Sequence, residues 1–393
     1  MLSVSRRFLL ILTGLAALTA MVSPARTIET SAPNVFLIDA DSGGVLFEKN
    51  ADAAVIPAST AKVMTAELVF HDLREGRITL DDQFLISETA WRQGGAPSRG
   101  SSMYAALNSH VRVEDLIRGL VIDSGNDAAI ALAEGLAGSE GAFATQMTRR
   151  ARELGLDHLV FTNAWGRDDP DQRVTARDMA RLARHVITTY PDYYKYFGEK
   201  EFTWNKIRQT NRNPLLAMDF GADGLKTGYI DAASGYSVVA SAVQNGQRLI
   251  LALYGARTFK ERSEEARKLF LWGFRAFTPK TVFTANETIG TARVFGGAKG
   301  DVALAAHEDV KLLVPVLTGE RFTGKIVYLG PLRAPIEEGQ KVAHLIVKRG
   351  TLEAVDIPLY TAEAVPEGPL ARKALDAGLE LGVELWRKYV TKQ

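Results

Sequence analysis

The feature that most constrains this chain is a serine and a lysine three residues apart, Ser59 and Lys62, followed by a helix-prone run from Val63 to Phe70. In a helix, residues three apart lie on the same face, so the lysine amine comes within reach of the serine hydroxyl. A serine hydroxyl is a poor nucleophile until an adjacent base takes its proton. A lysine can be that base when burial or a neighbouring cation lowers its pKa towards neutral. Pro57 suits the entry to such a helix, whose N-terminus stabilises negative charge.

Two further motifs follow along the chain. Ser124-Gly125-Asn126 lies between two apolar stretches with helical spacing, and Lys226-Thr227-Gly228 precedes a region of strands. Each motif alone is ordinary, because Ser-Gly-Asn is turn chemistry and Lys-Thr-Gly could open any strand. The three motifs together, in this order, are nearly the set that serine enzymes of the penicillin-binding class carry.

On these motifs the sequence resembles the low-molecular-mass penicillin-binding proteins, specifically the D-alanyl-D-alanine carboxypeptidases. The resemblance implies an α/β (α+β) penicillin-binding/β-lactamase-like transpeptidase fold with a helical insertion. A small all-β sandwich domain and a C-terminal amphipathic helix would follow. The segment from Leu159 to Gly166 resembles the same family, and Pro335 to Gln340 extends the resemblance more weakly towards the C-terminus.

Composition excludes several other classes. The 393 residues allow two domains with real cores, and a net charge of +1 gives no electrostatic footprint for nucleic acid. The absence of cysteine excludes disulfides and thiolate metal sites. The six histidines stand singly, without a His-Glu-x-x-His pair, so we expect neither a metal nor a cofactor.

Residues 1–25 have the pattern of an export signal. Arg6 and Arg7 form a basic region, Phe8 to Val22 is an apolar run, and Ser23-Pro24-Ala25 offers small residues for cleavage. The apolar run is short for a spanning helix, although an uncleaved N-terminal anchor is the alternative. The two arginines also resemble a twin-arginine signal. We therefore expect an exported protein at the periplasmic face of a bacterial inner membrane.

Residues 26–279 are predicted to form the serine peptidase domain as sheet, helical insertion, sheet and helix. One hairpin is predicted from Val35–Ala40 and Val45–Lys49. A second is predicted from Ser237–Val243 and Arg248–Tyr254, because Asn-Gly between apolar runs favours a tight turn. Apolar spacing predicts helices over 114–122, 128–136, 175–187 with Thr175 as N-cap, and 261–277.

Pro279 and a change of pattern near Val282 predict a domain boundary. Residues 282–365 consist of short strands separated by Gly, Asp and Pro, which favours a small all-β sandwich. We find no catalytic constellation in it.

Residues 366–393 are predicted to form an amphipathic helix that anchors the protein at a membrane surface. Leu370, Leu381, Leu385, Trp386 and Tyr389 fall on one side of a helical wheel, with Asp376 among the charged residues opposite. A helix packed on protein is the alternative, because the polar face mixes both charges and contains glycines.

The resemblance also implies roles for individual residues. Ser59 would attack the carbonyl between two terminal D-alanines of a peptidoglycan stem peptide, and Lys62 would take its proton. Ser124 could pass that proton to the leaving amine, while Lys226 keeps Lys62 neutral by like-charge repulsion. Backbone N–H groups of Ser59 and Tyr229 are natural donors to the oxyanion. β-Lactam antibiotics would acylate the same serine.

The other predicted substrate-binding residues surround this serine. Asn126 would hydrogen-bond the substrate amide, and Gly228 on an edge strand would let the substrate backbone approach. Arg212 and Arg262 match positions where the family carries arginines for a carboxylate, with a solvated surface arginine as the alternative for both. The full predicted set is Asn126, Lys226, Thr227, Gly228, Arg212 and Arg262. The family often has histidine where this chain has Tyr229, which leaves pH dependence and deacylation open.

Three rival functions remain at this stage. A β-lactamase needs a base for rapid hydrolysis of the acyl-enzyme, and Glu153 superficially resembles one. However, Glu153 continues a helical run that Gly155 would cap, so we interpret it as a solvated helix residue. A non-enzymatic peptidoglycan-binding protein is disfavoured because all three motifs are intact. A transpeptidase or endopeptidase would share the same motifs.

Overall fold

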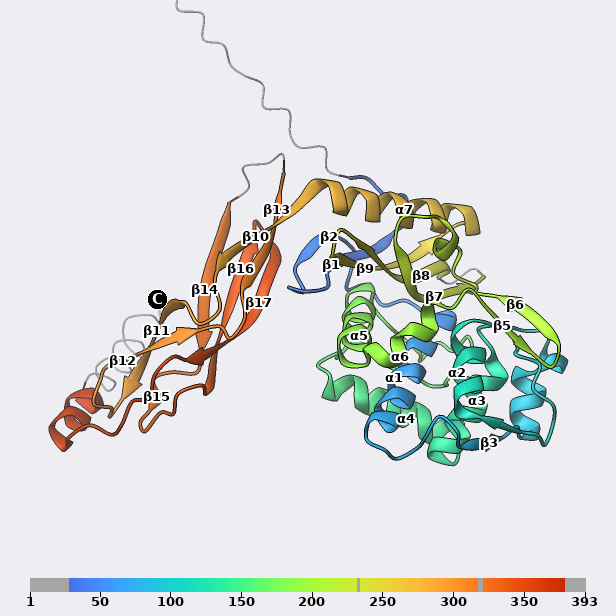
Figure 1. Cartoon of the computed structure of the whole chain (residues 1–393), viewed down its shortest axis with the longest axis horizontal. Coiled ribbons are helices and arrows are strands. Elements are labelled where there is room, and N and C mark those ends of the chain that lie inside the picture. Colours follow the sequence, from blue (N-terminus) through green and yellow to red (C-terminus); the bar gives the residue numbers. More distant parts are fainter. Residues whose placement is uncertain (1–27, 232–233, 317–320, 379–393) are drawn as a thin grey trace, which may run out of the picture.

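The computed structural model describes residues 28–231, 234–316 and 321–378, and its first unit is built on a five-stranded antiparallel sheet (Figure 1). The strand order is β2-β1-β9-β8-β7, so the N-terminal hairpin pairs with a strand from late in the chain. The strands are β1 Asn34–Asp39, β2 Val45–Lys49, β7 Ala222–Ile230, β8 Gly235–Gln244 and β9 Gln247–Ala256. Both predicted hairpins are confirmed, and the Asn245-Gly246 turn has the positive φ angles that such a turn requires.

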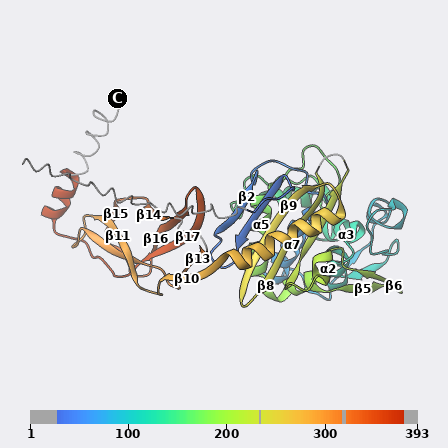
Figure 2. The same cartoon turned by 90° about the horizontal axis from the view of Figure 1, so that it is seen from above.

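Helices cover both faces of this sheet, as the strand pattern requires. Along β1, Phe36 and Ile38 pack with the helical insertion, whereas Val35 and Leu37 pack with the helix that ends the domain. Figure 2 shows that last helix, α7, lying along the sheet. The helices are α1 Lys62–Arg74, α2 Val113–Val121, α3 Asn126–Ala137, α4 Glu140–Glu153, α5 Ala176–Thr189, α6 Pro191–Tyr194 and α7 Phe259–Ala276.

Local signals set the helix ends. The Thr175 side chain accepts a hydrogen bond from Asp178 N, which is the predicted N-cap of α5. The Ser-Gly-Asn turn separates α2 from α3 as expected. Short elements fill the rest of the unit: η1 Ala58–Ala61, β3 Gln83–Leu85, η2 Ala90–Gly94, η3 Ala96–Ser98, β4 His110–Arg112, η4 Lys195–Gly198, β5 Glu201–Trp204, β6 Ile207–Thr210 and η5 Pro214–Ala217.

The second unit is all-β and has its own apolar core. A six-stranded sheet has the order β14-β16-β17-β12-β11-β15, and β10 pairs with β13. The strands are β10 Phe277–Phe283, β11 Thr288–Phe295, β12 Asp301–Ala305, β13 Val310–Pro315, β14 Phe322–Tyr328, β15 Leu332–Arg333, β16 Lys341–Arg349 and β17 Leu352–Thr361.

The change from helix to strand comes earlier than the sequence suggested. Phe277 was expected to end α7, but it begins β10, and Pro279 lies inside that strand opposite Leu313. Proline is tolerated there because, among the described strands, β10 pairs with β13 alone and its other edge needs no N–H donor. The predicted boundary at Pro279–Val282 therefore falls within the first strand of the second unit.

Only the beginning of the predicted tail helix lies within the described residues. Residues 370–378 are helical, and Asp376 Oδ2 accepts a hydrogen bond from Gly296 N at 2.8 Å. Asp376, placed on the polar face, thus attaches the helix to the β unit, while Leu370 and Leu375 are exposed. The predicted signal (1–25) and the apolar residues beyond 378 lie outside the described residues. Within residues 28–231, 234–316 and 321–378, no helix is long and apolar enough to cross a membrane.

Candidate active site

Ser59 and Lys62 lie next to each other at the junction of η1 and α1. Lys62 Nζ lies 3.0 Å from Ser59 Oγ, 2.8 Å from Asn126 Oδ1 and 2.7 Å from the Trp165 carbonyl. Thr60 holds the turn by donating to the Pro57 carbonyl at 2.6 Å. The hydroxyl and the amine are therefore already within hydrogen-bond reach, as general-base activation of a serine requires.

Lys62 is suited to act as a base because of its surroundings. The side chain is completely buried, and this burial lowers the pKa of Lys62 well below its ordinary value. The charge of Lys226 lowers the pKa further, whereas Asp127 and Glu140 oppose the shift. The repulsion by Lys226 that we expected from the sequence is present, but burial is the larger cause.

The Ser124-Gly125-Asn126 turn enters the site between α2 and α3. Ser124 has φ +61° and is buried, and Asn126 contributes its Oδ1 to Lys62. The next residue, Asp127, fixes the loop in front of the turn by accepting four hydrogen bonds. Its donors are Ser102 Oγ and the backbone N–H groups of Met103, Ala105 and Ala128.

Lys226-Thr227-Gly228 lies on β7, the edge strand of the sheet. A Cβ atom on Gly228 would lie 2.6 Å from Ser237 Oγ and 2.9 Å from Ala58 Cβ. A side chain at this position would therefore collide with β8 and with the turn that carries Ser59. Burial, assisted by Arg212 and Arg262, lowers the pKa of Lys226 to about 7.

The two predicted arginines occupy opposite environments. Arg212 is exposed, and its Nη2 donates to Gln209 Oε1 at 3.2 Å. Arg262 is only 3% exposed, with its guanidinium over the ring of Phe259. Its Nε and Nη2 have no hydrogen-bond partner among the described residues. Burial lowers the pKa of Arg262 to about 10, and the structure therefore excludes a solvated surface position for Arg262.

Tyr229 and Glu153 are the two residues that the sequence connected with hydrolysis of the acyl-enzyme. Tyr229 is half exposed at the end of β7, with its ring 4.3 Å from that of Tyr236. Glu153 ends α4 and pairs with Arg149 and Arg150 on the surface, as its helical context predicted. Among the described residues, its ion pairs and hydrogen bonds are to these two arginines and none reaches Ser59.

Several contacts that shape the site were not predicted, although the segment Leu159–Gly166 resembled the family. Trp165 contributes a backbone carbonyl to Lys62, and any residue type has a carbonyl. Gly166 has φ +86°, and a Cβ there would lie 1.8 Å from the Ala58 carbonyl. Glu140 at the start of α4 accepts from Ala164 N, and burial raises its pKa. Together these contacts hold the 163–166 segment against the Ser59 turn.

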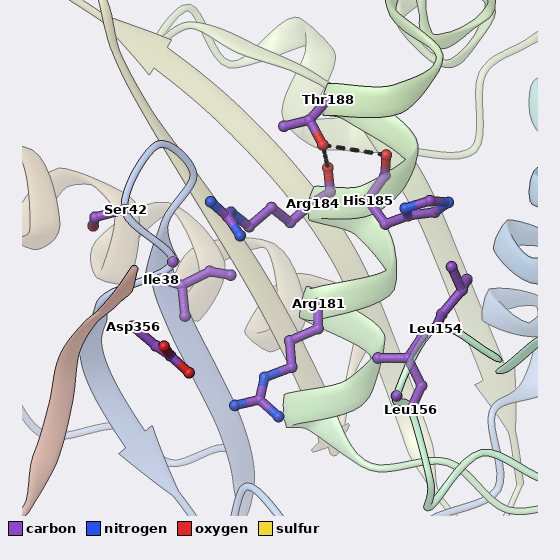
Figure 3. Close-up of a pocket in the computed structure, with 11 residues that line it drawn as sticks. Ile38, Ser42, Leu154, Leu156, Arg181, Arg184, His185, Thr188 and Asp356 are labelled. Atoms are coloured by element: carbon purple, nitrogen blue, oxygen red, sulfur yellow. Dashed lines mark hydrogen bonds between the residues drawn. The ribbon is translucent and has the colours of Figure 1, made fainter. Parts of the chain in front are cut away.

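A separate pocket of about 450 Å³ lies between α5 and the β1–β2 turn (Figure 3). It is lined by Arg181, Arg184 and Asp356 among others, and by none of the predicted site residues. Arg184 is held there by the carbonyls of Ala40 and Asp41. Within the part of the chain that the structure describes, no cluster of three His, Cys, Asp or Glu side chains could hold a metal ion.

The arrangement is typical of a class of protein: a serine acyl-transfer enzyme in which Ser59 is the candidate nucleophile and the buried Lys62 is the candidate base. Family models agree with this class. Residues 19–258 match the D-alanyl-D-alanine carboxypeptidase family, and residues 277–367 match the C-terminal domain of penicillin-binding protein 5. The chain belongs to the D-alanyl-D-alanine carboxypeptidase family, and it is a serine peptidase.

Individual relatives and solved structures are similar over nearly the whole length. The chain is 41% identical over 335 residues to the D-alanyl-D-alanine carboxypeptidase DacC of Escherichia coli, covering 84% of each chain. It is 36% identical to DacA of Haemophilus influenzae, covering 88% of each. The solved penicillin-binding protein 5 of Haemophilus influenzae has a TM-score of 0.75 at 35% identity, covering 88% of this chain and all of that one. These matches confirm the predicted family and fold class.

Proposed function

We propose that this protein removes the terminal D-alanine from peptidoglycan stem peptides ending in D-alanyl-D-alanine, with Ser59 as the nucleophile. The observation that carries the proposal is the 3.0 Å contact between Ser59 Oγ and the buried Lys62 Nζ. Membership of the carboxypeptidase family supports the substrate class.

In the proposed acylation, Ser59 Oγ attacks the carbonyl carbon of the penultimate D-alanine as Lys62 Nζ takes the hydroxyl proton. The tetrahedral intermediate then collapses, the C–N bond breaks, and D-alanine leaves. Ser124 relays the proton to the leaving nitrogen. Backbone N–H groups of Ser59 and Tyr229 stabilise the oxyanion. Water hydrolyses the Ser59 ester and regenerates the hydroxyl.

Substrate binding is assigned to the groups around this serine. Asn126 and the edge strand with Thr227 and Gly228 hold the peptide backbone of the substrate. Lys226, Arg212 and Arg262 form a cationic group that meets the terminal carboxylate. The charges of both arginines lower the pKa of Lys226, which supports the proximity of the three groups. β-Lactams acylate Ser59 in the same site.

We further propose that the protein is exported to the periplasm and lies at the surface of the inner membrane through residues 366–393. The exposed Leu370 and Leu375, on the side of the helix that the tail pattern makes apolar, support this orientation. Attachment of Asp376 to the β unit leaves that apolar side directed away from the protein.

The experiment is D-alanine release from a peptide ending in D-alanyl-D-alanine by residues 26–393. Ser59→Ala is the control for the nucleophile. Release by the wild type and none by the variant is the expected result. A wild type that forms a penicilloyl adduct but releases no D-alanine would replace the carboxypeptidase with a transpeptidase.

A further inference from the structure

Asp123 is a buried carboxylic acid that the proposed mechanism does not use. It directly precedes Ser124 and has no exposed surface. Neither of its carboxylate oxygens has a hydrogen-bond partner among the described residues. Buried polar groups in folded proteins are nearly always hydrogen-bonded, so this group requires a specific explanation.

The backbone at Asp123 is attached to the segment that leads to β7. Arg212 N donates to the Ile122 carbonyl at 3.3 Å, and Arg212 Nε approaches the Asp123 carbonyl at 3.5 Å. The Arg212 carbonyl in turn accepts from Thr227 Oγ1 at 3.3 Å. A continuous series of contacts therefore connects Asp123 with the residue next to Lys226.

The charged groups that act on Asp123 are Arg212, Lys226 and Asp127. Burial raises the pKa of Asp123 to about 7, and the two cations oppose this shift. Lys226 is equally enclosed: it is 1% exposed, and its Nζ has no hydrogen-bond partner in the described part of the chain. The charges that act on Lys226 are Arg212, Arg262 and Asp123, and only Asp123 favours its protonated form.

We propose that Asp123 is a positioning residue that acts through Lys226: its carboxylate is the internal counter-ion that favours the protonated form of Lys226, which is the form able to bind a substrate carboxylate. This inference rests on the proposed substrate-binding role of Lys226. Opposite charges that are close together in a buried site stabilise each other's charged form. Asp127 cannot take this role, because its carboxylate already accepts four hydrogen bonds.

The test is the pH dependence of Ser59 acylation by benzylpenicillin, which carries a carboxylate. Asp123→Asn keeps the side-chain size and removes the negative charge. Without the counter-ion, Lys226 should lose its proton at a pH about one unit lower. We expect the acylation rate constants of wild type and variant to agree within about twofold at pH 5.5, and the variant to be about tenfold slower at pH 8.

Three control variants make this result specific, and a fourth variant repeats the test. Asp219→Asn removes an exposed carboxylate between Arg212 and Lys226 in the chain and should leave the pH profile unchanged. Asp123→Glu keeps the charge and should restore most of the rate at pH 8. In a Lys226→Arg background, Asp123→Asn should no longer move the profile, because arginine stays protonated throughout this range. Asp123→Ser repeats the test with a smaller side chain should the asparagine variant not fold.

An unchanged pH profile in Asp123→Asn would overturn the inference. If the melting temperature of that variant were lowered as well, Asp123 would have a packing role only. A variant that is faster at pH 8 would also overturn it, because Asp123 would then act by repelling the substrate. A shift that persists with Lys226→Arg would mean that Lys226 is not the target. Wild-type D-alanine release tests the proposed function separately, so release with an unmoved variant profile contradicts this inference alone.

Discussion

The burial of Lys226 predicts a dependence of stability on pH, with a sign and a size. Lys226 is 1% exposed, and burial with the nearby arginines lowers its pKa from 10.5 to about 7. Because the folded state has the lower pKa, the unfolded chain binds more protons between pH 7 and 10.5, and wild-type stability rises with pH across that window. A difference of about 3.5 pH units (10.5 − 7), at about 1.4 kcal/mol per unit, corresponds to about 5 kcal/mol of destabilisation below pH 7.

Lys226→Met tests this reasoning, because methionine is unbranched and fills a similar volume without an ionisable group. We expect the free energy of unfolding of the variant to exceed that of the wild type by up to about 5 kcal/mol at pH 6, and the two to converge by pH 10.5. Urea unfolding followed by tryptophan fluorescence is the assay. Four of the five tryptophans, Trp91, Trp165, Trp204 and Trp272, lie in the catalytic unit.

The control for Lys226→Met is the same substitution at a lysine that is not buried. Lys260 is exposed on α7 beside Glu264, so Lys260→Met should give no pH-dependent difference from the wild type. A stability difference for Lys226→Met that is the same at pH 6 and pH 10 would refute the reasoning. It would mean that packing, and not the protonation of Lys226, separates the two proteins.

Other predictions follow from single contacts. Lys62→Met should slow acylation of Ser59 by benzylpenicillin by about a thousandfold, measured by quenched labelling, and a smaller loss than tenfold would rule out Lys62 as the base. Gly228→Val should lower both the melting temperature and the acylation rate, because its Cβ would meet Ser237 Oγ at 2.6 Å. Glu153→Gln should leave hydrolysis of the penicilloyl-enzyme unchanged; slower hydrolysis would restore the lactamase alternative. Deletion of residues 369–393 should move the protein from the membrane to the soluble fraction, and unchanged fractionation would contradict the anchor.

Features determined by local sequence were predictable. The Asn245-Gly246 turn, the Thr175 cap and the pairing of Ser59 with Lys62 each depend on residues close together in the chain. Their geometry is set by the local chain, whereas the low pKa of Lys62 also requires its burial in the fold. The prediction that the three motifs form one site came from the resemblance to the family, because no local rule connects segments that are far apart in the chain.

Features determined by long-range packing were not predictable. Both Arg212 and Arg262 are single arginines in the sequence, yet the fold buries only Arg262, which lies in the first turn of α7 with its guanidinium over the ring of Tyr236. The role of the Trp165 carbonyl has no sequence signal, because every residue has a carbonyl. Pro279 looked like a boundary, and only the pairing of β10 with a single neighbour makes it compatible with a strand.

The central claim is that Ser59 is the nucleophile, activated by the buried amine of Lys62. The most direct measurement is mass spectrometry of the protein after incubation with benzylpenicillin, with peptide mapping of the adduct. The account predicts one penicilloyl group, on Ser59, that is absent from Ser59→Ala and strongly reduced in Lys62→Met. An adduct on any other residue, or an equal yield in Ser59→Ala, would contradict it.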